Sequence, residues 1–181
     1  YCVYENDKYL TSSDEITTTL TKDKKGYILN GQKKYVIFGD VSDYFAILAN
    51  SKEGLMFVLV NKNSEGLEIK QTSSLDQTRP MCEINMKDIF ISDDEIMIGS
   101  DSCINTWEKV KNISLGYLAM EQVGGAQACL DMSTQYAKER IQFGRPIGSF
   151  QAIQHICANM LVQLESAKSV AYSAVRTDTS D

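Results

Sequence analysis

The amino-acid sequence predicts an α+β fold, with a β-rich domain over residues 1–99 and a helical domain over residues 100–181. Short apolar segments separated by polar turns fill the first half, whereas apolar residues recur at three- or four-residue steps after Gly99. The second half contains two long segments joined by one loop, which favours an antiparallel helix pair. Such a pair alone exposes broad apolar faces, so we expect it to belong to a larger helical bundle.

The first strands are indicated by β-branched and aromatic residues. Residues 16–21 form a threonine-rich segment, and a charged turn separates it from the apolar residues 27–29. The pair Asn30-Gly31 follows, and it favours a two-residue hairpin because both positions tolerate positive φ. We therefore expect residues 34–38 to return as the next strand.

Two later segments, residues 44–49 and 55–60, are apolar along nearly their whole length. Uninterrupted apolar runs of this length are typical of strands that are buried on both faces. Residues 67–69, 84–86 and 89–91 add shorter strands. Their number and spacing favour a β-sandwich or a β-barrel.

The second half is predicted to form two long helices. Apolar residues recur at helical spacing from about residue 104 to residue 137, and again over residues 150–175. The intervening loop contains glycine and proline. Gly124 and Gly125 interrupt the first helix at a cost of about 1 kcal/mol each relative to alanine, and close contact with another helix is the usual compensation.

Composition and charge exclude several classes of protein. Of the 181 residues, 43% are apolar and 23% are charged, which is typical of a soluble globular protein. The net charge of −6 argues against a nucleic-acid partner, and no apolar run approaches the roughly 18 residues of a membrane span. Five cysteines without a C-x-x-C pair and a single histidine argue against a metal site or a disulfide framework. We therefore expect reduced thiols and a cytoplasmic location.

The loop between the predicted helices carries distinctive side chains. Arg140 and Arg145 flank Phe143 in a segment that bears glycine and proline. Guanidinium groups suit bidentate phosphate contacts, and a phenyl face can stack on a planar ring, so a phosphate-bearing aromatic cofactor would use both. The simpler alternative is a helix end at which Arg140 complements the helix dipole.

Aromatic residues also gather in the β-rich half. Most aromatic residues in strands belong to the core, and a planar cofactor against the sheet is the sharper alternative. Glu5, Asp7 and Asp14 could supply a pair of carboxylates, although a solvated acidic loop is the commoner arrangement. The aromatic residues concerned are Tyr1, Tyr4, Tyr27, Tyr35, Phe38, Tyr44 and Phe45.

Several segments resemble the acyl-CoA dehydrogenase family. Residues 136–154, YAKERIQFGRPIGSFQAIQ, match the family signature Y-A-x-x-R-x-x-F-G-x-x-(I/L)-x-x-x-Q-x-(I/V). The opening YCVYE is similar to the family's Y-C-V-T-E strand, and residues 28–37 are similar to its I-x-N-G-x-K-x-W-I-T/S segment. Residues 121–127, EQVGGAQ, fit the same family. The resemblance covers essentially the whole chain, whose strand-like opening indicates that it begins inside a longer protein.

The resemblance implies a β-barrel-like middle domain followed by an antiparallel long-helix pair that belongs to a helical bundle. It also implies an FAD-dependent acyl-CoA dehydrogenase of fatty-acid β-oxidation, which removes hydrogens from the α and β carbons of an acyl-CoA thioester. By the same resemblance, electrons pass to an electron-transfer flavoprotein, and the chains assemble into a homotetramer or another homo- or hetero-oligomer.

The resemblance further implies two sets of cofactor-binding residues. Val3, Tyr4 and Tyr35 match positions that touch the flavin ring. Ile37 matches the position whose Thr or Ser hydroxyl commonly faces flavin N5. The positions that match contacts with the FAD of a neighbouring subunit, or that lie in the same segment, are Arg140, Gln142, Phe143 and Gln151.

On the substrate side, Ser13 approximates a serine near the thioester and CoA. Ser114 matches the position at which some members place the catalytic base, and Leu115 matches a position at which many members carry arginine. Both are therefore candidates for the substrate pocket, which Leu115 would make less polar. Serine is no base at neutral pH, and most members place their glutamate after a third helix of the C-terminal domain. No catalytic residue is assigned.

Three functions remain open on the sequence alone. The chain is part of a working acyl-CoA dehydrogenase, or a non-catalytic or half-site FAD-binding subunit of a hetero-oligomeric dehydrogenase, or a flavin-independent module that keeps only the fold. The loss of the hydroxyl at Ile37 and of the arginine at Leu115 favours the second. The colour of the purified protein and its bleaching by an acyl-CoA distinguish the three.

Overall fold

The computed structural model describes residues 1–5 and 15–177. The chain divides into two compact units, Tyr1–Thr106 and Trp107–Asp181. The helix α1 (Ser100–Glu139) begins in the first unit and continues into the second, so the division falls inside a helix. A domain limit between residues 99 and 100 stays a prediction.

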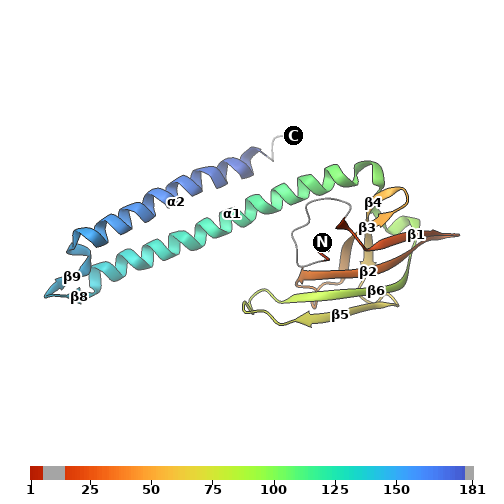
Figure 1. Cartoon of the computed structure of the whole chain (residues 1–181), viewed down its shortest axis with the longest axis horizontal. Helices are drawn as coiled ribbons and strands as arrows, with labels where there is room; N and C mark the ends of the chain where they lie inside the picture. Colours follow the sequence, from red (N-terminus) through yellow and green to blue (C-terminus); the bar gives the residue numbers. More distant parts are fainter. Residues whose placement is uncertain (6–14, 178–181) are drawn as a thin grey trace. The chain divides into compact units, whose positions relative to one another are not determined.

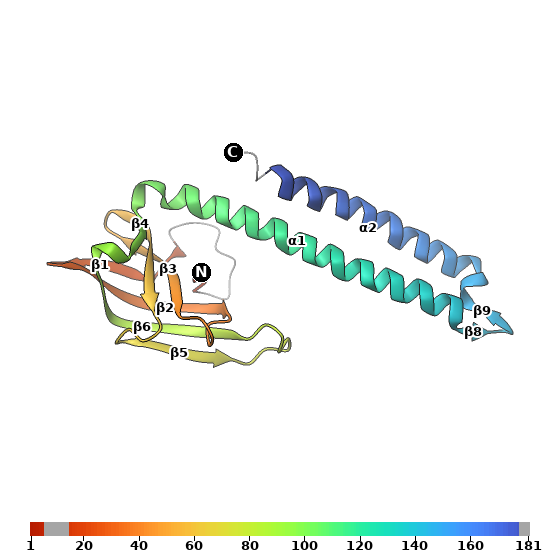
Figure 2. The same ribbon diagram turned by 180° about the vertical axis from the view of Figure 1, so that it is seen from behind.

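A single mixed sheet dominates the first unit (Figures 1 and 2). Its strands are β1 (Thr19–Asp23), β2 (Gly26–Ile37), β3 (Tyr44–Ser51), β4 (Gly54–Asn61), β5 (Leu67–Thr72), β6 (Met81–Ile91) and β7 (Ile96–Ile98). The spatial order is β5-β6-β2-β1-β3-β4-β7, and all neighbours are antiparallel except the parallel pair β1 and β3. The sheet curves around its core. Its outer strands, β5 and β7, do not pair with each other, so the sheet does not close into a barrel.

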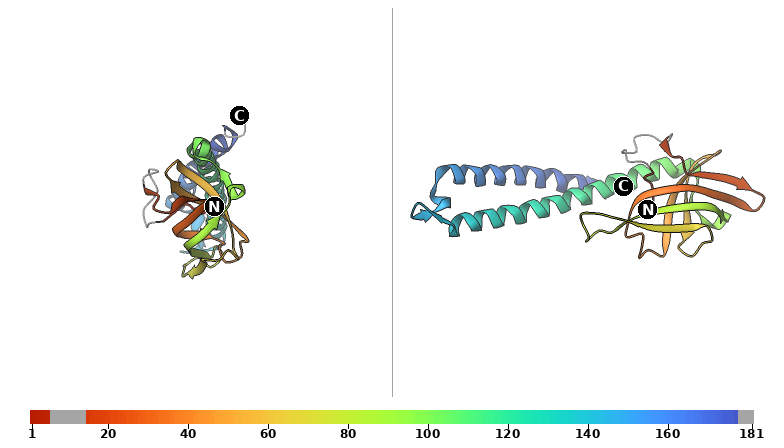
Figure 3. Two further views of the ribbon diagram at one scale, coloured as in Figure 1. Left: turned by 90° about the vertical axis from the view of Figure 1, so that its right-hand side faces the viewer. Right: turned by 60° about the horizontal axis from the view of Figure 1, so that its bottom comes forward.

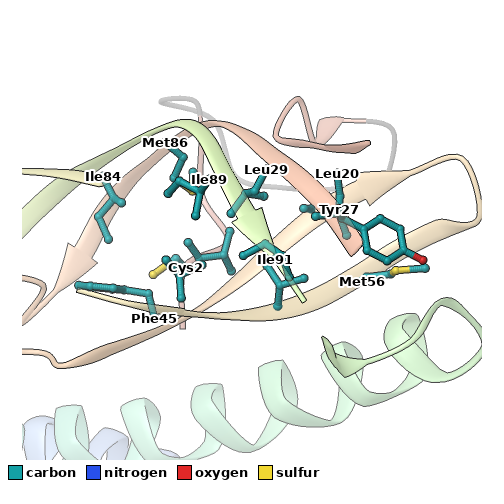
Figure 4. Packing of buried hydrophobic residues seen from close by; sticks show 14 of the residues in the cluster. Cys2, Leu20, Tyr27, Leu29, Phe45, Met56, Ile84, Met86, Ile89 and Ile91 are labelled. Atoms are coloured by element: carbon teal, nitrogen blue, oxygen red, sulfur yellow. The ribbon is translucent and has the colours of Figure 1, made fainter. Parts of the chain in front are cut away.

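The hydrophobic core lies between the β2–β6 part of the sheet and the β3–β4 part. Figure 4 shows Ile84 of β6 pointing toward Cys2 and Phe45. The predicted double burial of residues 44–49 and 55–60 is confirmed, since most side chains of β3 and β4 are buried. The buried cluster comprises Cys2, Leu20, Tyr27, Leu29, Val36, Phe45, Ile47, Ala49, Met56, Val58, Val60, Ile84, Met86, Ile89 and Ile91.

The predicted hairpin at Asn30-Gly31 is wrong, because β2 runs through both residues. The chain reverses earlier, between β1 and β2, where Asp23 pairs with Gly26. Gly31 is instead required by a close approach, since a Cβ there would lie 2.7 Å from the Thr18 Cα. The Asn30 amide group exchanges hydrogen bonds with Asp88 of β6, at 2.8 and 3.1 Å, where the register of the two strands shifts. Asn30 and Gly31 therefore form no turn. Asn30 lies at a bulge, and Gly31 allows a close backbone contact.

Residues 1–5 extend the sheet between β2 and β3. Cys2 forms a parallel bridge with Ile47, through hydrogen bonds to Ala46 and Leu48 of 2.7 and 3.1 Å. On the other side, the Lys34 amide donates to the Tyr4 carbonyl at 2.7 Å. Strand β1 lies between β2 and β3. Residues 1–5 lie between the same two strands, next to the start of β1.

The second unit consists mainly of an antiparallel helix pair (Figure 3). The 40-residue helix α1 is followed by β8 (Ile141–Gln142), β9 (Arg145–Pro146) and the 27-residue helix α2 (Gln151–Thr177). A short 3₁₀ turn at Ile147–Ser149 precedes α2, and another, at Asp93–Glu95, lies in the first unit. In the described part of the chain, none of the helices has the length and apolarity to cross a membrane.

Close contact between the two helices occurs at Gly116, not at the glycine pair. A Cβ on Gly116 would lie 3.2 Å from Val175 Cγ2 of α2. A Cβ on Gly124 or Gly125 would have no atom of a neighbouring element within 4 Å among the described residues. The expectation that helix contact compensates this pair is therefore wrong within the described residues.

Candidate functional site

A β-bulge in β2 turns two of the predicted cofactor-binding residues outward. Between the pairs Lys33–Ile84 and Val36–Cys82, two residues of β2 stand opposite one residue of β6. The extra residue reverses the alternation of the strand. Lys33 and Val36 are both buried, whereas Tyr35 is 42% exposed and Ile37 is 52% exposed. Tyr35 has a φ of 56°, in the left-handed region that bulky residues rarely adopt.

The chain that follows the bulge exposes further apolar side chains. Phe38, with a φ of 57°, Val41 and Tyr44 are all solvent-exposed, and the Ser42 hydroxyl holds this turn by donating to the Phe38 carbonyl at 2.8 Å. Of the seven aromatic residues that the sequence singles out in this half, only Tyr27 and Phe45 are buried, so the expectation that they belong to the core holds for these two alone. An exposed ring surface of this kind suits the apolar face of a planar cofactor.

The opening segment contributes differently at its two predicted positions. Tyr4 is half-buried, and its carbonyl accepts the Lys34 amide, so Tyr4 is linked directly to the residue that precedes Tyr35. Val3 is only 1% exposed and packs in the interior. The structure therefore gives Val3 a packing role, and its contact with a cofactor stays a prediction.

A buried ion pair lies beside these residues, and sequence reasoning missed it. The Lys33 ammonium lies 2.5 Å from the Glu5 carboxylate, and their side chains are 0% and 3% exposed. The carboxylate also accepts hydrogen bonds from the Thr17 amide, the Thr17 hydroxyl and the Thr18 amide, at 2.5, 2.6 and 3.0 Å. The signal that could have indicated the pair was Lys33, a charged residue at a buried position of β2. Glu5 is thus not part of a solvated acidic loop, while Asp7 and Asp14 lie outside the described residues.

Two opposing effects set the ionisation of this pair. Burial alone would raise the pKa of Glu5, but the Lys33 charge and the hydrogen bonds from Lys33, Thr17 and Thr18 outweigh it and lower the pKa from 4.5 to about 2. Burial lowers the pKa of Lys33, and the adjacent Glu5 opposes that change. At neutral pH the carboxylate is therefore charged and fully paired.

The second predicted set lies in a small hairpin between the helices. Arg140 follows the last residue of α1, and Gln142 of β8 pairs with Arg145 of β9. Phe143 and Gly144 form the two-residue turn, with φ values of 53° and 77°, as a type I′ hairpin requires. Phe143 projects into solvent and is 92% exposed. The structure thus brings Arg140, Gln142 and Phe143 together on one hairpin.

Aromatic and cationic contacts hold this hairpin in place. The Arg145 guanidinium lies 4.2 Å from the centroid of the Phe150 ring, and the Phe143 ring meets the edge of the same ring at a centroid distance of 6.1 Å. A Cβ on Gly148 would lie 2.9 Å from the Ala137 carbonyl, so the chain after the hairpin passes close to α1. Gln151 begins α2 and is exposed. Arg140 also follows the C-terminus of α1, which agrees with the helix-dipole interpretation, and its contact with a cofactor phosphate stays a prediction.

The predicted substrate residues are placed as follows. The Ser114 hydroxyl donates to the Val110 carbonyl of its own helix at 2.7 Å. Leu115 is 43% exposed and lines an apolar groove between α1 and α2, together with residues such as Ala126, Met160 and Ala171. Ser13 lies outside the described residues. That this groove or Leu115 belongs to a substrate pocket stays a prediction.

The family models and the curated relatives agree on one family. Residues 5–89 match the model "Acyl-CoA dehydrogenase, middle domain", and residues 115–180 match "Acyl-CoA dehydrogenase, C-terminal domain". The mitochondrial short/branched chain specific acyl-CoA dehydrogenase of Bos taurus is 30% identical over 91% of this chain and 40% of its own length. The 3-(aryl)acrylate reductase of Clostridium sporogenes is 30% identical over 88% of this chain and 44% of its own length. The chain therefore spans less than half the length of these relatives.

Solved structures give the same result for the fold. The glutaryl-coenzyme A dehydrogenase glutaryl-CoA complex superposes with a TM-score of 0.88 at 27% identity, over 98% of this chain and 47% of that chain. An acyl-CoA dehydrogenase complexed with FAD from Bacillus anthracis has a TM-score of 0.85 at 23% identity, over 95% of this chain and 30% of that chain. With the two domain matches and the curated relatives, this likeness shows that the chain belongs to the acyl-CoA dehydrogenase family.

Proposed function

We propose that the chain is part of an FAD-dependent oxidoreductase that carries out α,β-dehydrogenation of an acyl-CoA thioester. The observation that carries the proposal is the bulge of β2, which exposes Tyr35 and Ile37 as an apolar surface in a chain of this family. FAD held by these residues would supply the acceptor for the hydride of the β carbon, and the α proton would pass to a base that is not assigned in this chain. Tyr35 and Tyr4 orient the flavin ring, and the apolar side chain of Ile37 excludes water from its edge.

Four residues of the second unit bind the FAD of a neighbouring subunit in this proposal. Arg140 supplies a permanent positive charge for phosphate, Gln142 and Gln151 supply amide groups, and the exposed Phe143 supplies a ring face. A hairpin that projects an aromatic ring into solvent suits a contact outside its own unit. We therefore propose a homo-oligomer, with a homotetramer as the expected form.

The acyl-CoA is proposed to bind near Ser13, Ser114 and Leu115. The hydroxyl of Ser114 is engaged by its own helix, which agrees with a lining role and not with proton transfer. No catalytic residue of this chain is proposed. The expected electron acceptor is an electron-transfer flavoprotein, within fatty-acid β-oxidation. All five cysteines are free, and three are buried, which supports a reducing, cytoplasmic location.

A non-catalytic or half-site subunit is the second candidate. The exposed, apolar Ile37 favours it, because no hydroxyl is available there to bond the flavin. Such a subunit would bind FAD, or complete a partner's FAD site, without oxidising a substrate.

Purified full-length protein tests both candidates. A yellow protein whose flavin absorbance bleaches anaerobically on addition of an acyl-CoA, with re-oxidation by an electron-transfer flavoprotein, supports the dehydrogenase. Bound flavin that no acyl-CoA reduces supports the half-site subunit. A colourless protein that takes up no FAD contradicts the dehydrogenase and a subunit that binds its own FAD, and favours a flavin-independent module.

A further inference from the structure

The opening segment is held in the sheet by few main-chain contacts. Within the described residues, Cys2 bonds to β3 on one side, and Tyr4 bonds to Lys34 of β2 on the other. Side-chain interactions add to these main-chain contacts.

The Glu5–Lys33 ion pair supplies those interactions. Through Glu5, the segment is tied to Thr17 and Thr18 before β1 and to Lys33 of β2. The Lys33 ammonium also donates to the Val3 carbonyl at 3.4 Å, which adds a second link to the same segment. No buried side-chain nitrogen or oxygen among the described residues is left without a partner. The pair is thus a complete polar network that joins three parts of the chain.

Stability alone does not account for this pair. Replacing a buried ion pair with apolar residues of similar size is frequently neutral or stabilising, because both charges lose their hydration on burial. What an ion pair adds is a defined position, since the Glu5 carboxylate accepts four donors from fixed directions. An apolar replacement would fill the space without fixing it.

The location of Lys33 relates the pair to the bulge. Lys33 is the last regularly paired residue of β2 before the bulge, Lys34 donates to Tyr4, and Tyr35 follows with positive φ. The same lysine therefore lies at the start of the bulge and contacts the opening segment.

We propose that Glu5 and Lys33 are positioning residues that hold Tyr4 and Tyr35 at the spacing needed to contact one flavin ring. Neither side chain touches the cofactor, since both are buried within the β-domain. The inference rests on the proposed flavin site.

The test compares a buried and an exposed ion pair in the full-length protein. Glu5→Gln and Lys33→Met are made singly and together. The matched control is Glu53→Gln with Lys22→Met, an exposed pair at 3.6 Å between the turn that joins β3 to β4 and strand β1. Four quantities are measured: the thermal midpoint, the FAD dissociation constant, the visible flavin spectrum and hydrogen exchange of the Lys34 amide.

The proposal expects the buried double variant to regain most of the stability that Lys33→Met loses. Its FAD dissociation constant should nevertheless rise by roughly tenfold or more, with a shifted flavin spectrum and faster exchange at Lys34. The control pair, which contacts the Tyr27 hydroxyl, should leave the FAD dissociation constant, the flavin spectrum and exchange at Lys34 unchanged. If Lys33→Met does not fold, Glu5→Gln, which keeps the shape and acceptor oxygen of the side chain, is compared with the double variant.

A double variant with wild-type FAD affinity, spectrum and Lys34 exchange would overturn the proposal and leave the pair a purely structural role. If the wild-type protein binds no FAD, the proposed function fails, and exchange at Lys34 alone decides on the positioning role. Faster exchange in the double variant then supports a defined register of Tyr4 and Lys34, and unchanged exchange contradicts it.

Discussion

The β2 bulge and the β8–β9 hairpin both expose an aromatic side chain on a residue with positive φ, but they are built differently. Phe143 is presented by local contacts, all within residues 136–154. Tyr35 is presented by partners far away in the sequence, namely β6 and residues 1–5. The hairpin is therefore specified by its own sequence, whereas the bulge exists only when the whole sheet has formed.

The largest expected effect concerns the long-range region. Lys33→Met removes the partner of a buried carboxylate and should reduce the free energy of unfolding by about 3–5 kcal/mol. Lys22→Met, at an exposed ion pair, should change it by less than about 0.5 kcal/mol. Urea denaturation of the two variants measures the difference. If both variants lost the same free energy of unfolding, burial of the Glu5–Lys33 pair would not increase its contribution to stability.

The pH dependence of stability should follow the same carboxylate. The pKa of Glu5 is about 2 in the folded chain, against 4.5 for the unperturbed group. The unfolded state therefore binds the proton first, and stability present above about pH 4.5 is lost as the pH falls toward 2, by on the order of 3 kcal/mol. Glu5→Gln should flatten the acid limb of the curve. The prediction is wrong if wild type and Glu5→Gln lose stability in parallel.

In the local region, the largest effect is expected on cofactor binding. Arg140→Ala removes the proposed charge-assisted phosphate contact, which would be worth about 1.5–3 kcal/mol, and should weaken FAD binding about 10- to 150-fold and loosen the oligomer. Arg145→Ala should weaken it less, because that guanidinium is stacked on Phe150. Flavin retention on gel filtration measures both. Equal FAD loss would show that Arg140 has no special role.

A substitution at Gly144 tests the backbone conformation of the β8–β9 turn separately from the side chains of Arg140 and Phe143. Gly144 has a φ of 77° and no atom of the described residues near a Cβ position, so Gly144→Ala adds backbone strain without a steric clash. The expected cost is about 1–2 kcal/mol, confined to residues 140–147 in hydrogen exchange. Gly99→Ala, also without a nearby atom and without a positive φ, is the control. Exchange that spreads to β2 would contradict the independence of the two regions.

The smallest effect is expected at Ile37. If the missing hydroxyl limits hydride transfer, Ile37→Thr should accelerate anaerobic flavin reduction by about two- to twelvefold, from a hydrogen bond of about 0.5–1.5 kcal/mol. FAD affinity should not change. Ile37→Val, which keeps the side chain apolar, is the control. An unchanged or slower rate would assign the position to packing.

The same contrast explains which parts of the molecule the sequence predicts. The helix pair, the strands β3 and β4, and the segment between the helices follow from periodicity and from a local motif. The hairpin expected at Asn30-Gly31 was wrong, because pairing with β6 and the approach of Thr18 override the local turn preference. The Glu5–Lys33 pair joins residues 28 positions apart, and no local pattern reports such a contact.

The insertion of residues 1–5 between β2 and β3 has a consequence for the order of folding. Residues 1–5 are synthesised before β2 and β3, so they cannot dock until those strands have been made. Contacts between residues so far apart in the sequence form slowly. Until the segment docks, the Lys34 amide on β2 and the Ala46 carbonyl and Leu48 amide on β3 lack these partners, so each strand has an open edge there. An edge of this kind recruits other chains. Aggregation during refolding should therefore rise when docking is slowed, before any loss of native stability is measurable.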